Sequence, residues 1–251
     1  MRVLVVSDIH ANLTALEAVI DDAGQFDFQA VWCLGDTVGY GPEPNECIAR
    51  IRELGAVAVV GNHDWAVLGG MDIDDFNQEA RRGVLWTREH LTPENLSWLG
   101  ALPGAPIQIG DFTLTHGSPR DPVWEYILYP SIARANLDYF TTPFCLIGHT
   151  HVPVLYLWQA ADGNLRTVPP PPGQTLDLWP AGVAGGSRGL LNPGSVGQPR
   201  DNDPRAAYAI LDTEQMTWLS RRVVYPVEIT QARMRQAALP ERLINRIAYG
   251  W

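Results

Sequence analysis

Lysine is absent from this chain of 251 residues, so that all 18 of its basic residues are arginine. P-loops, protein kinase sites and enzymes that form a Schiff base each depend on a lysine side chain, and the composition therefore excludes these three classes. Basic residues are also outnumbered by 28 acidic ones, which gives a formal net charge of -10. This charge provides no general attraction to nucleic acids or anionic lipid surfaces.

Cysteine is scarce, with Cys33, Cys47 and Cys145 spaced widely along the chain. An odd number of cysteines at such spacing predicts buried free thiols in a reducing cytosol rather than a disulfide framework. Long apolar runs are missing as well: the chain reaches Asp8 after four consecutive apolar residues, too few for the core of a signal peptide. No run approaches the roughly 20 apolar residues of a membrane-spanning helix. These features predict a soluble, cytoplasmic protein.

The hydrophobic content of 46% is enough to bury a large core, and we expect residues 1–251 to form one domain. Apolar runs and helical periodicity predict three buried strands and two connecting helices near the N-terminus: strands at 3–6, 30–34 and 57–60, and helices at 13–23 and 44–54. Helical crossovers between successive strands imply a largely parallel sheet, in which ligands bind at the carboxyl ends of the strands.

Polar side chains follow each of these strands at its carboxyl end. Asp8 and His10 come after the first strand, Asp36 after the second, and Asn62 and His63 after the third. Because the carboxyl ends of parallel strands meet at one edge of a sheet, we expect these side chains to lie close together.

Two later strands end in histidine. His116 follows a strand predicted at 112–115, and His149 and His151 follow one predicted at 144–147. In extended chain, residues two apart point the same way and lie roughly 6 to 7 Å apart, so this pair could serve two neighbouring metal ions. Histidines also cap strands or lie hydrogen-bonded beneath loops, which is the alternative for the pair taken alone.

Taken together, five of the six histidines lie at strand ends, where scattered structural histidines would not gather. The candidate metal ligands are Asp8, His10, Asp36, Asn62, His116, His149 and His151. Imidazole, carboxylate and amide donors suit Mn, Fe, Zn or Ni better than Ca, and the lack of thiolates disfavours a closed zinc site. One four-coordinate ion does not need so many ligands, whereas two ions about 3.5 to 4 Å apart, bridged by a carboxylate, use them all.

Two segments carry candidate substrate contacts. The loop at 118–130 contains Arg120 and several aromatic side chains, which either pack the loop down or stack on a substrate. The sequence Asn-Pro-Gly-Ser at 192–195 is either a hairpin corner or a turn that directs Arg200 at an anion.

Helices are also predicted at 74–90 and from about Thr230. His90 lies late in the first of these helices, where a cation favours the helix dipole, and we expect it to be structural.

The motifs, in their order, resemble those of the calcineurin-like metallophosphoesterase superfamily. They are Asp8-Ile9-His10, Gly35-Asp36 through Gly39, Gly61-Asn62-His63-Asp64, His116-Gly117 and Gly148-His149-Thr150-His151, followed by the turn at 192–195. Each motif alone is a weak signal, but the ordered set is highly specific.

Differences within the motifs narrow the resemblance to one branch. Protein Ser/Thr phosphatases and symmetrical diadenosine tetraphosphatases carry Asp-Arg-Gly after the motif of the bridging aspartate, and Glu after Asn-His. This chain has Thr37-Val38-Gly39-Tyr40 and Asp64 in those places. It is more similar to the small bacterial and archaeal phosphodiesterase-like members, although Ala11 replaces the glycine that often follows their Asp-x-His.

The resemblance implies an α/β fold, a four-layer sandwich of two mixed β-sheets flanked by α-helices. It also implies two divalent metal ions, with Mn as the expected metal. Asp36 would bridge the ions; one would bind Asp8, His10 and His151, and the other Asn62, His116 and His149.

The implied reaction is hydrolysis of a small phosphoester, with diesters favoured, by in-line attack of a hydroxide that bridges the metals. His63 would protonate the leaving oxygen or stabilise its charge, while its neighbour Asp64 either orients His63 or caps the next helix. The expected catalytic residues are Asp36, Asn62 and His63, and the expected substrate contacts are Asn62, His63, Arg120 and Arg200.

Three alternatives stay open at this stage. One is a phosphomonoesterase or nucleotide pyrophosphohydrolase, and another is a metal-bound binding protein of the same fold that has lost turnover. A third, a two-metal hydrolase of amides or esters, has no support from the ordered motifs. The sequence leaves the natural substrate, the native metal and homo-oligomerisation undecided.

Overall fold

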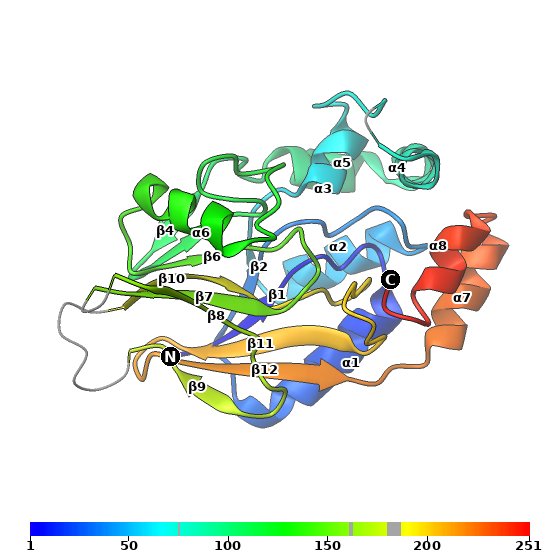
Figure 1. Cartoon of the computed structure of the whole chain (residues 1–251). Helices are drawn as coiled ribbons and strands as arrows, with labels where there is room; N and C mark the ends of the chain where they lie inside the picture. Colours follow the sequence, from blue (N-terminus) through cyan, green and yellow to red (C-terminus); the bar gives the residue numbers. More distant parts are fainter. Residues whose placement is uncertain (75, 161–162, 180–186) are drawn as a thin grey trace.

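Two six-stranded mixed sheets lie face to face in the computed structural model, which describes residues 1–74, 76–160, 163–179 and 187–251 (Figure 1). The first sheet contains, in spatial order, β3 (Val57–Ala58), β2 (Ala30–Cys33), β1 (Arg2–Val6), β11 (Ala206–Asp212), β12 (Thr217–Val223) and β9 (Thr175–Asp177). The second contains β4 (Ile107–Ile109), β5 (Phe112–Leu114), β6 (Phe144–Leu146), β10 (Ser187–Asn192), β7 (Val154–Gln159) and β8 (Leu165–Val168).

Helices cover the outer faces of the sheets and one end of the sandwich (Figure 1). They are α1 (Leu13–Ala23), α2 (Pro44–Glu53), α3 (Asn62–Leu68), α4 (Gln78–His90), α5 (Pro93–Gly100), α6 (Pro130–Asn136), α7 (Val227–Gln236) and α8 (Glu241–Arg246). Helix α1 starts as predicted, because the Asn12 side chain accepts a hydrogen bond from the Ala15 amide, 3.2 Å away.

The alternation of side chains along β1 explains the layers. Val3 and Val5 pack into a core shared by both sheets, whereas Leu4 and Val6 pack on the opposite face with residues of α1 and α2. The second sheet repeats this arrangement, since Cys145 of β6 faces α6. The four-layer sandwich of two mixed sheets flanked by helices is therefore confirmed.

The expectation of a largely parallel sheet was wrong for half of the first sheet. Strands β1, β2 and β3 are parallel, as their helical crossovers require. Strands β11 and β12 form a hairpin, and β11 pairs antiparallel with β1. A short connection between neighbouring strands enforces antiparallel pairing, so the later strands could not continue the parallel order.

Two predicted helix boundaries need correction. Helix α4 starts at Gln78 rather than residue 74, because the Asn77 side chain caps it by accepting from the Ala80 amide; residue 75 lies outside the described residues. The C-terminal helix starts at Val227 rather than Thr230, and a second helix, α8, follows it. Helix α8 was not expected as a separate helix.

The turn at 192–195 is not a hairpin corner. It connects β10 of the second sheet to the segment that leads into β11 of the first sheet. Gly194 has a φ of 85°, a conformation that favours glycine, and the turn therefore carries the chain from one sheet to the other.

The cysteines agree with the expectation of free thiols, because Cys33, Cys47 and Cys145 are all buried and unbridged. Among the described residues, no helix has the length and apolar character needed to cross a membrane.

Asp22 ties α1 to the first sheet, and its removal should destabilise the fold. Its carboxylate accepts hydrogen bonds from Arg221 at 2.8 Å and Tyr208 at 2.6 Å. Burial acts to raise the pKa of Asp22, but these hydrogen bonds outweigh burial and lower it. We expect Asp22→Asn to reduce the free energy of unfolding at pH 7 by roughly 1 to 3 kcal/mol in urea titrations.

The difference in the free energy of unfolding between the wild type and Asp22→Asn should decrease at low pH. Because the folded pKa of Asp22 lies below its ordinary value of 3.8, the stabilisation is complete above that value and is lost as the pH falls through the folded pKa. Asp21→Asn, at the exposed neighbouring position, is the matched control and should change stability little. Equal losses in the two variants would contradict this role of Asp22.

Candidate metal centre

The carboxyl ends of the parallel strands bring the predicted ligands together at one end of the sandwich. Asp8 and His10 follow β1, Asp36 follows β2, His116 follows β5, and the pair at 149 and 151 follows β6. In the part of the chain that the structure describes, the ligand atoms form two groups with members within 4.8 Å of one another. The first group is Asp8, His10, Asp36 and His151, and the second is Asp36, His116 and His149.

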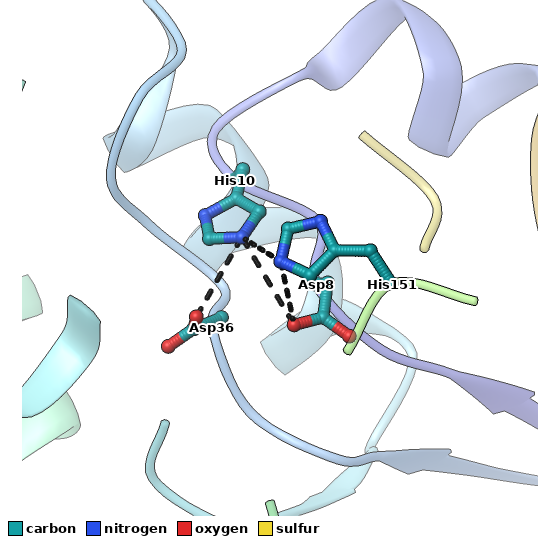
Figure 2. Close-up of side chains that lie close together, drawn as sticks. All are labelled: Asp8, His10, Asp36 and His151. Carbon is teal, nitrogen blue, oxygen red and sulfur yellow. Dashed lines mark hydrogen bonds and ion pairs between the residues drawn. The ribbon is translucent and has the colours of Figure 1, made fainter. Parts of the chain in front are cut away.

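The first group is compact (Figure 2). The Nε2 atoms of His10 and His151 are 3.2 Å apart, and His151 Nε2 is 3.3 Å from Asp8 Oδ1. His10 Nε2 lies 3.6 Å from Asp36 Oδ2. Two ring nitrogens that face each other and two carboxylates form a set of convergent donors that suits a transition-metal ion.

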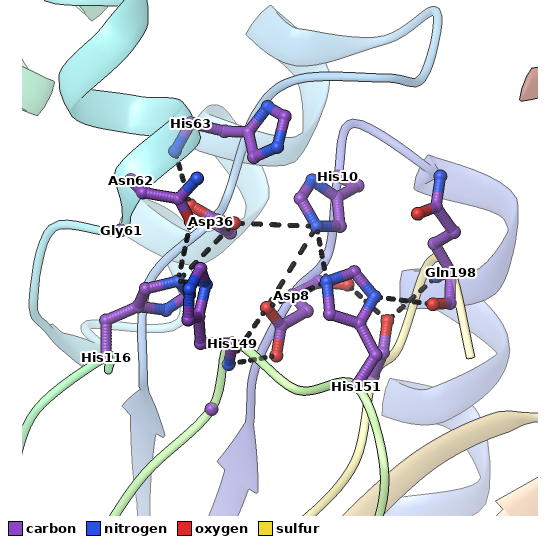
Figure 3. Close-up of polar contacts among 12 residues, drawn as sticks. Asp8, His10, Asp36, Gly61, Asn62, His63, His116, His149, His151 and Gln198 are labelled. Carbon is purple, nitrogen blue, oxygen red and sulfur yellow. Dashed lines mark hydrogen bonds and ion pairs between the residues drawn. The ribbon is translucent and has the colours of Figure 1, made fainter. Parts of the chain in front are cut away.

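The second group shares Asp36 with the first (Figure 3). His116 Nε2 lies 3.4 Å from Asp36 Oδ2, 3.1 Å from His149 Nδ1 and 3.1 Å from Asn62 Oδ1. Asp36 Oδ2 is therefore close to a ring nitrogen of each group, and it is buried without a hydrogen-bond partner. A carboxylate in this position is the one that can bridge two ions.

The backbone at these residues is not extended, contrary to the geometry assumed for the histidine pair. Asp8, His10, Asp36, His149 and His151 all have φ values between 50° and 64°. This left-handed conformation is uncommon outside glycine and turns the side chains away from their strand directions. As a result His149 joins the second group and His151 the first, rather than both pointing the same way.

Backbone carbonyl groups orient all four rings. His10 Nδ1 contacts the Val38 carbonyl at 3.2 Å, His116 Nδ1 that of Leu34 at 2.8 Å, His151 Nδ1 that of Gln198 at 2.6 Å, and His149 Nε2 that of Trp124 at 3.1 Å. Each contact leaves the opposite nitrogen directed at the cluster, as is usual for metal-binding histidines. Sequence analysis missed these partners because a carbonyl group leaves no signal in the residue type.

The charges of the cluster also fit a metal cation. Asp8 and Asp36 are almost completely buried, and no arginine of the described chain lies within ion-pair distance of either carboxylate. Burial raises the pKa of Asp8 to about 7, a sign that its negative charge lacks compensation. Burying two carboxylates is costly without a cation, and divalent ions held by these residues would supply the missing positive charge.

Three of the four imidazole groups have the neutral state that metal binding needs. Burial lowers the pKa of His10, His149 and His151 well below the ordinary value, so these rings are neutral at pH 7. At His116 burial acts in the same direction, but the charge of Asp36 outweighs it and raises the pKa to about 9.

His63 lies beside the cluster without joining either group. Its backbone amide donates to Asp36 Oδ1 at 2.8 Å, while its buried Nδ1 has no hydrogen-bond partner. Burial lowers the pKa of the His63 side chain to about 4, so the ring is neutral at pH 7. Gly61 allows the backbone before His63 to lie against Asp36, because a Cβ atom at Gly61 would overlap the Asp36 carboxylate.

Asp64 caps a helix rather than orienting His63. Its carboxylate accepts from the backbone amides of Gly61 and Val38, each at 3.0 Å, and of Thr37 at 3.3 Å. It therefore closes the N-terminus of α3 and ties this turn to the loop after Asp36.

The two predicted arginine contacts are placed differently. Arg200 follows the turn at 192–195, its amide donates to the His151 carbonyl at 3.4 Å, and its guanidinium is half-buried next to the cluster. Arg120 does not join the cluster: its guanidinium pairs with Glu125 and lies 5.8 Å from the centre of the Tyr139 ring. A substrate contact by Arg120 is not supported by this position.

Two aromatic residues of the loop at 118–130 lie beside the cluster. Tyr126 stacks on the His149 ring at 3.7 Å between centroids, and Trp124 lies 6.1 Å from the same ring. His90 is remote from these groups and stacks on Trp86 at 4.0 Å, in agreement with the structural role expected for it.

Comparisons with known proteins agree with this geometry. The sequence model of the calcineurin-like phosphoesterase superfamily domain matches residues 1–216. The solved structure of a metallophosphoesterase from Sphaerobacter thermophilus is 46% identical, with a TM-score of 0.87 over 100% of this chain and 99% of the other.

Two curated relatives are similar over different lengths. An uncharacterised protein of Methanocaldococcus jannaschii is 36% identical over 252 residues, covering 99% of this chain and 98% of its own. A symmetrical bis(5'-nucleosyl)-tetraphosphatase of Thioalkalivibrio sulfidiphilus is 38% identical over 72 residues, 27% of this chain and 26% of its own.

Proposed function

The chain belongs to the calcineurin-like phosphoesterase superfamily, and from this we propose that it is a two-metal phosphoesterase that favours phosphodiesters. The observation that carries the proposal is the position of Asp36, whose unpartnered Oδ2 atom lies 3.6 Å from His10 Nε2 and 3.4 Å from His116 Nε2. One carboxylate shared by two groups of candidate ligands fits a pair of divalent ions. Asp8, His10 and His151 would complete one site, and Asn62, His116 and His149 the other.

When bound, two such ions activate water as a nucleophile and neutralise charge on the phosphoryl oxygens. We propose Mn as the native metal, because the candidate ligands combine imidazole nitrogens with carboxylate oxygens, a mixture that suits it. The buried free thiols of the chain fit a reducing compartment, and we propose a cytoplasmic location and one functional domain over residues 1–251.

The residues of the chain would divide the remaining tasks. Asn62 would contact a phosphoryl oxygen through its side-chain amide group, because its Oδ1 atom is already directed at His116. His63 would donate a hydrogen bond to the leaving oxygen, since a neutral imidazole keeps one N–H group in either tautomer, and its protonated form would donate a proton and return to the neutral ring.

A preference for diesters follows from the charges near the phosphorus atom. The segment Thr37-Val38-Gly39-Tyr40, which stands where related phosphatases carry Asp-Arg-Gly, contains no arginine, so the metals, Asn62 and His63 would hold the scissile group. Fewer fixed cations favour a diester, which carries one negative charge, over a monoester dianion. We expect bis-p-nitrophenyl phosphate to exceed p-nitrophenyl phosphate in kcat/KM, measured with Mn, Ni, Zn and Mg in turn.

The reactivity of the two model compounds differs, so a cyclic nucleotide and its monoester product form the second comparison. A preference for the monoester in both comparisons would support the alternative reading as a phosphomonoesterase. Absence of turnover with every metal would instead support a metal-bound binding protein.

Arg200 should affect binding more than turnover. It lies next to the cluster but contacts none of the seven proposed ligand side chains, and Gln198 Oε1, 3.1 Å away, is its side-chain partner. We expect Arg200→Ala to raise KM by about tenfold and to lower kcat less, as for the loss of one charge-assisted contact. Unaltered kinetics on every substrate would refute this role.

A further inference from the structure

A cavity of about 760 Å³ opens beside the candidate metal centre. Its walls include Tyr40, Tyr126 and Arg200 from the loops around the centre, together with Arg242, Arg246 and Trp251 from the C-terminal segment. Cavities of roughly 300 to 1,000 Å³ accommodate small-molecule ligands, so this one has room for much more than a single phosphoryl group.

Two tyrosines connect the cavity to the metal centre. The Tyr40 ring lies 4.2 Å from the ring of His63 and 4.7 Å from that of His10, centre to centre. Tyr126 stacks on His149 at 3.7 Å. A substrate whose scissile phosphoryl group lies at the metal centre would therefore extend into this cavity between the two tyrosines.

Helix α8 contributes two of the three arginines. Its apolar residues pack with Tyr40 and α7 in a buried cluster that contains Leu243, Ile244 and Ile247. Arg242 and Arg246 are four residues apart and therefore lie on one side of the helix, where both line the cavity. Figure 1 shows α7 and α8 side by side at the end of the molecule.

The positive charge of this wall is only partly neutralised within the protein. Among the described residues, neither Arg200 nor Arg246 forms an ion pair with an Asp or Glu side chain; Arg246 Nε donates to the main-chain oxygen of Trp251, and Arg200 Nε is buried without a partner. Burial and the charge of Arg200 lower the pKa of Arg246 to about 10, which leaves it charged at pH 7. Glu79, the one acid among the described lining residues, lies 3.6 Å from Arg242.

Three arginines beside a single acid leave the cavity with an excess of positive charge, which suits an anionic ligand. The arrangement is notable because the chain as a whole has a net charge of -10, so the cavity is a local positive region on an acidic protein. Guanidinium groups bind phosphate with two parallel hydrogen bonds, which suits them to a phosphoryl group rather than a halide or a neutral ligand.

We propose that Arg200, Arg242 and Arg246 bind a second anionic group of the substrate, so that the preferred substrate is a phosphodiester of nucleoside size carrying a further phosphoryl group. This inference rests on the proposed function for the identity of the reaction. The scissile group lies at the metal centre, and the second phosphoryl group is held in the arginine-lined cavity and is not cleaved.

Two compounds that differ only in this group provide the test. Thymidine 5'-(p-nitrophenyl phosphate) and its 3'-phosphate share the base, the scissile diester and the p-nitrophenolate leaving group. In both, water forms the new bond to phosphorus as the bond to p-nitrophenolate breaks. We expect the 3'-phosphorylated compound to have at least about tenfold higher kcat/KM, mainly through a lower KM. Equal values for the two compounds would overturn the inference.

Variants locate the effect in the cavity. Arg246→Gln and Arg242→Gln should each reduce the advantage of the 3'-phosphate, by about tenfold for Arg246→Gln, and Arg246→Lys should retain part of it. Arg235→Gln, on the exposed face of α7, is the control and should keep the full advantage. A general loss of structure would lower both rates and leave their ratio unchanged. A wild-type ratio in the Arg242→Gln/Arg246→Gln double variant would contradict the assignment.

A binding measurement separates this inference from the proposed function. Calorimetry with Mn-loaded protein compares thymidine 3',5'-bisphosphate with thymidine 5'-phosphate, and the bisphosphate should bind about tenfold more tightly in the wild type but not in Arg246→Gln. Tighter binding of the bisphosphate, together with no turnover of either ester, would refute the proposed function and support this inference. Turnover of the esters, together with equal affinities for the two nucleotides, would support the proposed function and refute this inference.

Discussion

Replacing Asp36 with asparagine is expected to lower kcat/KM for phosphodiesters by about 10³-fold or more, because the loss of a shared ligand removes several kcal/mol of charge stabilisation. Asparagine keeps the size of the side chain and can still accept the hydrogen bond from the His63 amide. It cannot supply negative charge between His10 and His116, whose Nε2 atoms lie 3.6 and 3.4 Å from Asp36 Oδ2. Both proposed metal sites should therefore weaken together.

Metal content measures this result directly. After equilibration with excess Mn and removal of free metal, the wild type should retain two ions per chain and Asp36→Asn fewer than one. His151→Asn and His149→Asn are matched controls, because each removes a ligand from one group only and should cost one ion. Two ions bound to Asp36→Asn with wild-type affinity, or one ion bound to a fully active wild type, would refute the bridging role.

Replacing His63 with alanine is expected to lower kcat by roughly 10² to 10⁴-fold, the range found for general acid catalysis. Metal content should stay nearly unchanged, since His63 belongs to neither group of candidate ligands. Its amide would still donate to Asp36 Oδ1, because that contact uses the backbone. The side chain itself has a free Nδ1 atom beside the cluster, which makes it available to the leaving oxygen.

Leaving groups distinguish proton donation from a structural role. p-Nitrophenolate leaves without a proton, whereas an alkoxide requires one, so diesters with alkyl leaving groups should lose far more activity in His63→Ala. The same loss for both kinds of leaving group would show that His63 is not the proton donor. A fall in bound metal would point instead to a disturbed Asp36.

The first half of the fold could be predicted because its signals are local. The run Val3–Val6 is apolar on both faces, and in the structure alternate residues of it pack into two different cores. Asn12 caps α1 by accepting a hydrogen bond from the amide of Ala15, only three residues further along the chain. The boundary of α4 was missed because Asn77, inside the predicted segment, competes as a cap.

The residues of the candidate site could be predicted from the sequence, but their arrangement in space could not. β1 and β2 are parallel neighbours in the first sheet, and β5 and β6 in the second. Parallel pairing brings together the ligands within each sheet, and the packing of the two sheets brings the two sets together. Their division into two groups depends on left-handed backbone at His149 and His151, which residue identity does not specify. The predicted substrate contact of Arg120 also depended on geometry that residue identity does not specify, because its guanidinium forms an ion pair with Glu125 of the same loop.

The sequence by itself determined the buried strands, the set of candidate ligands and the exclusion of lysine-dependent chemistry, because periodicity and residue type act within a few neighbours along the chain. Only the tertiary structure decided which carbonyl groups orient the rings and that Arg246 of α8 faces the same cavity as Tyr40. These contacts join residues far apart in the sequence. The last of them arises from the packing of α8 on the loop after β2, which no local pattern encodes.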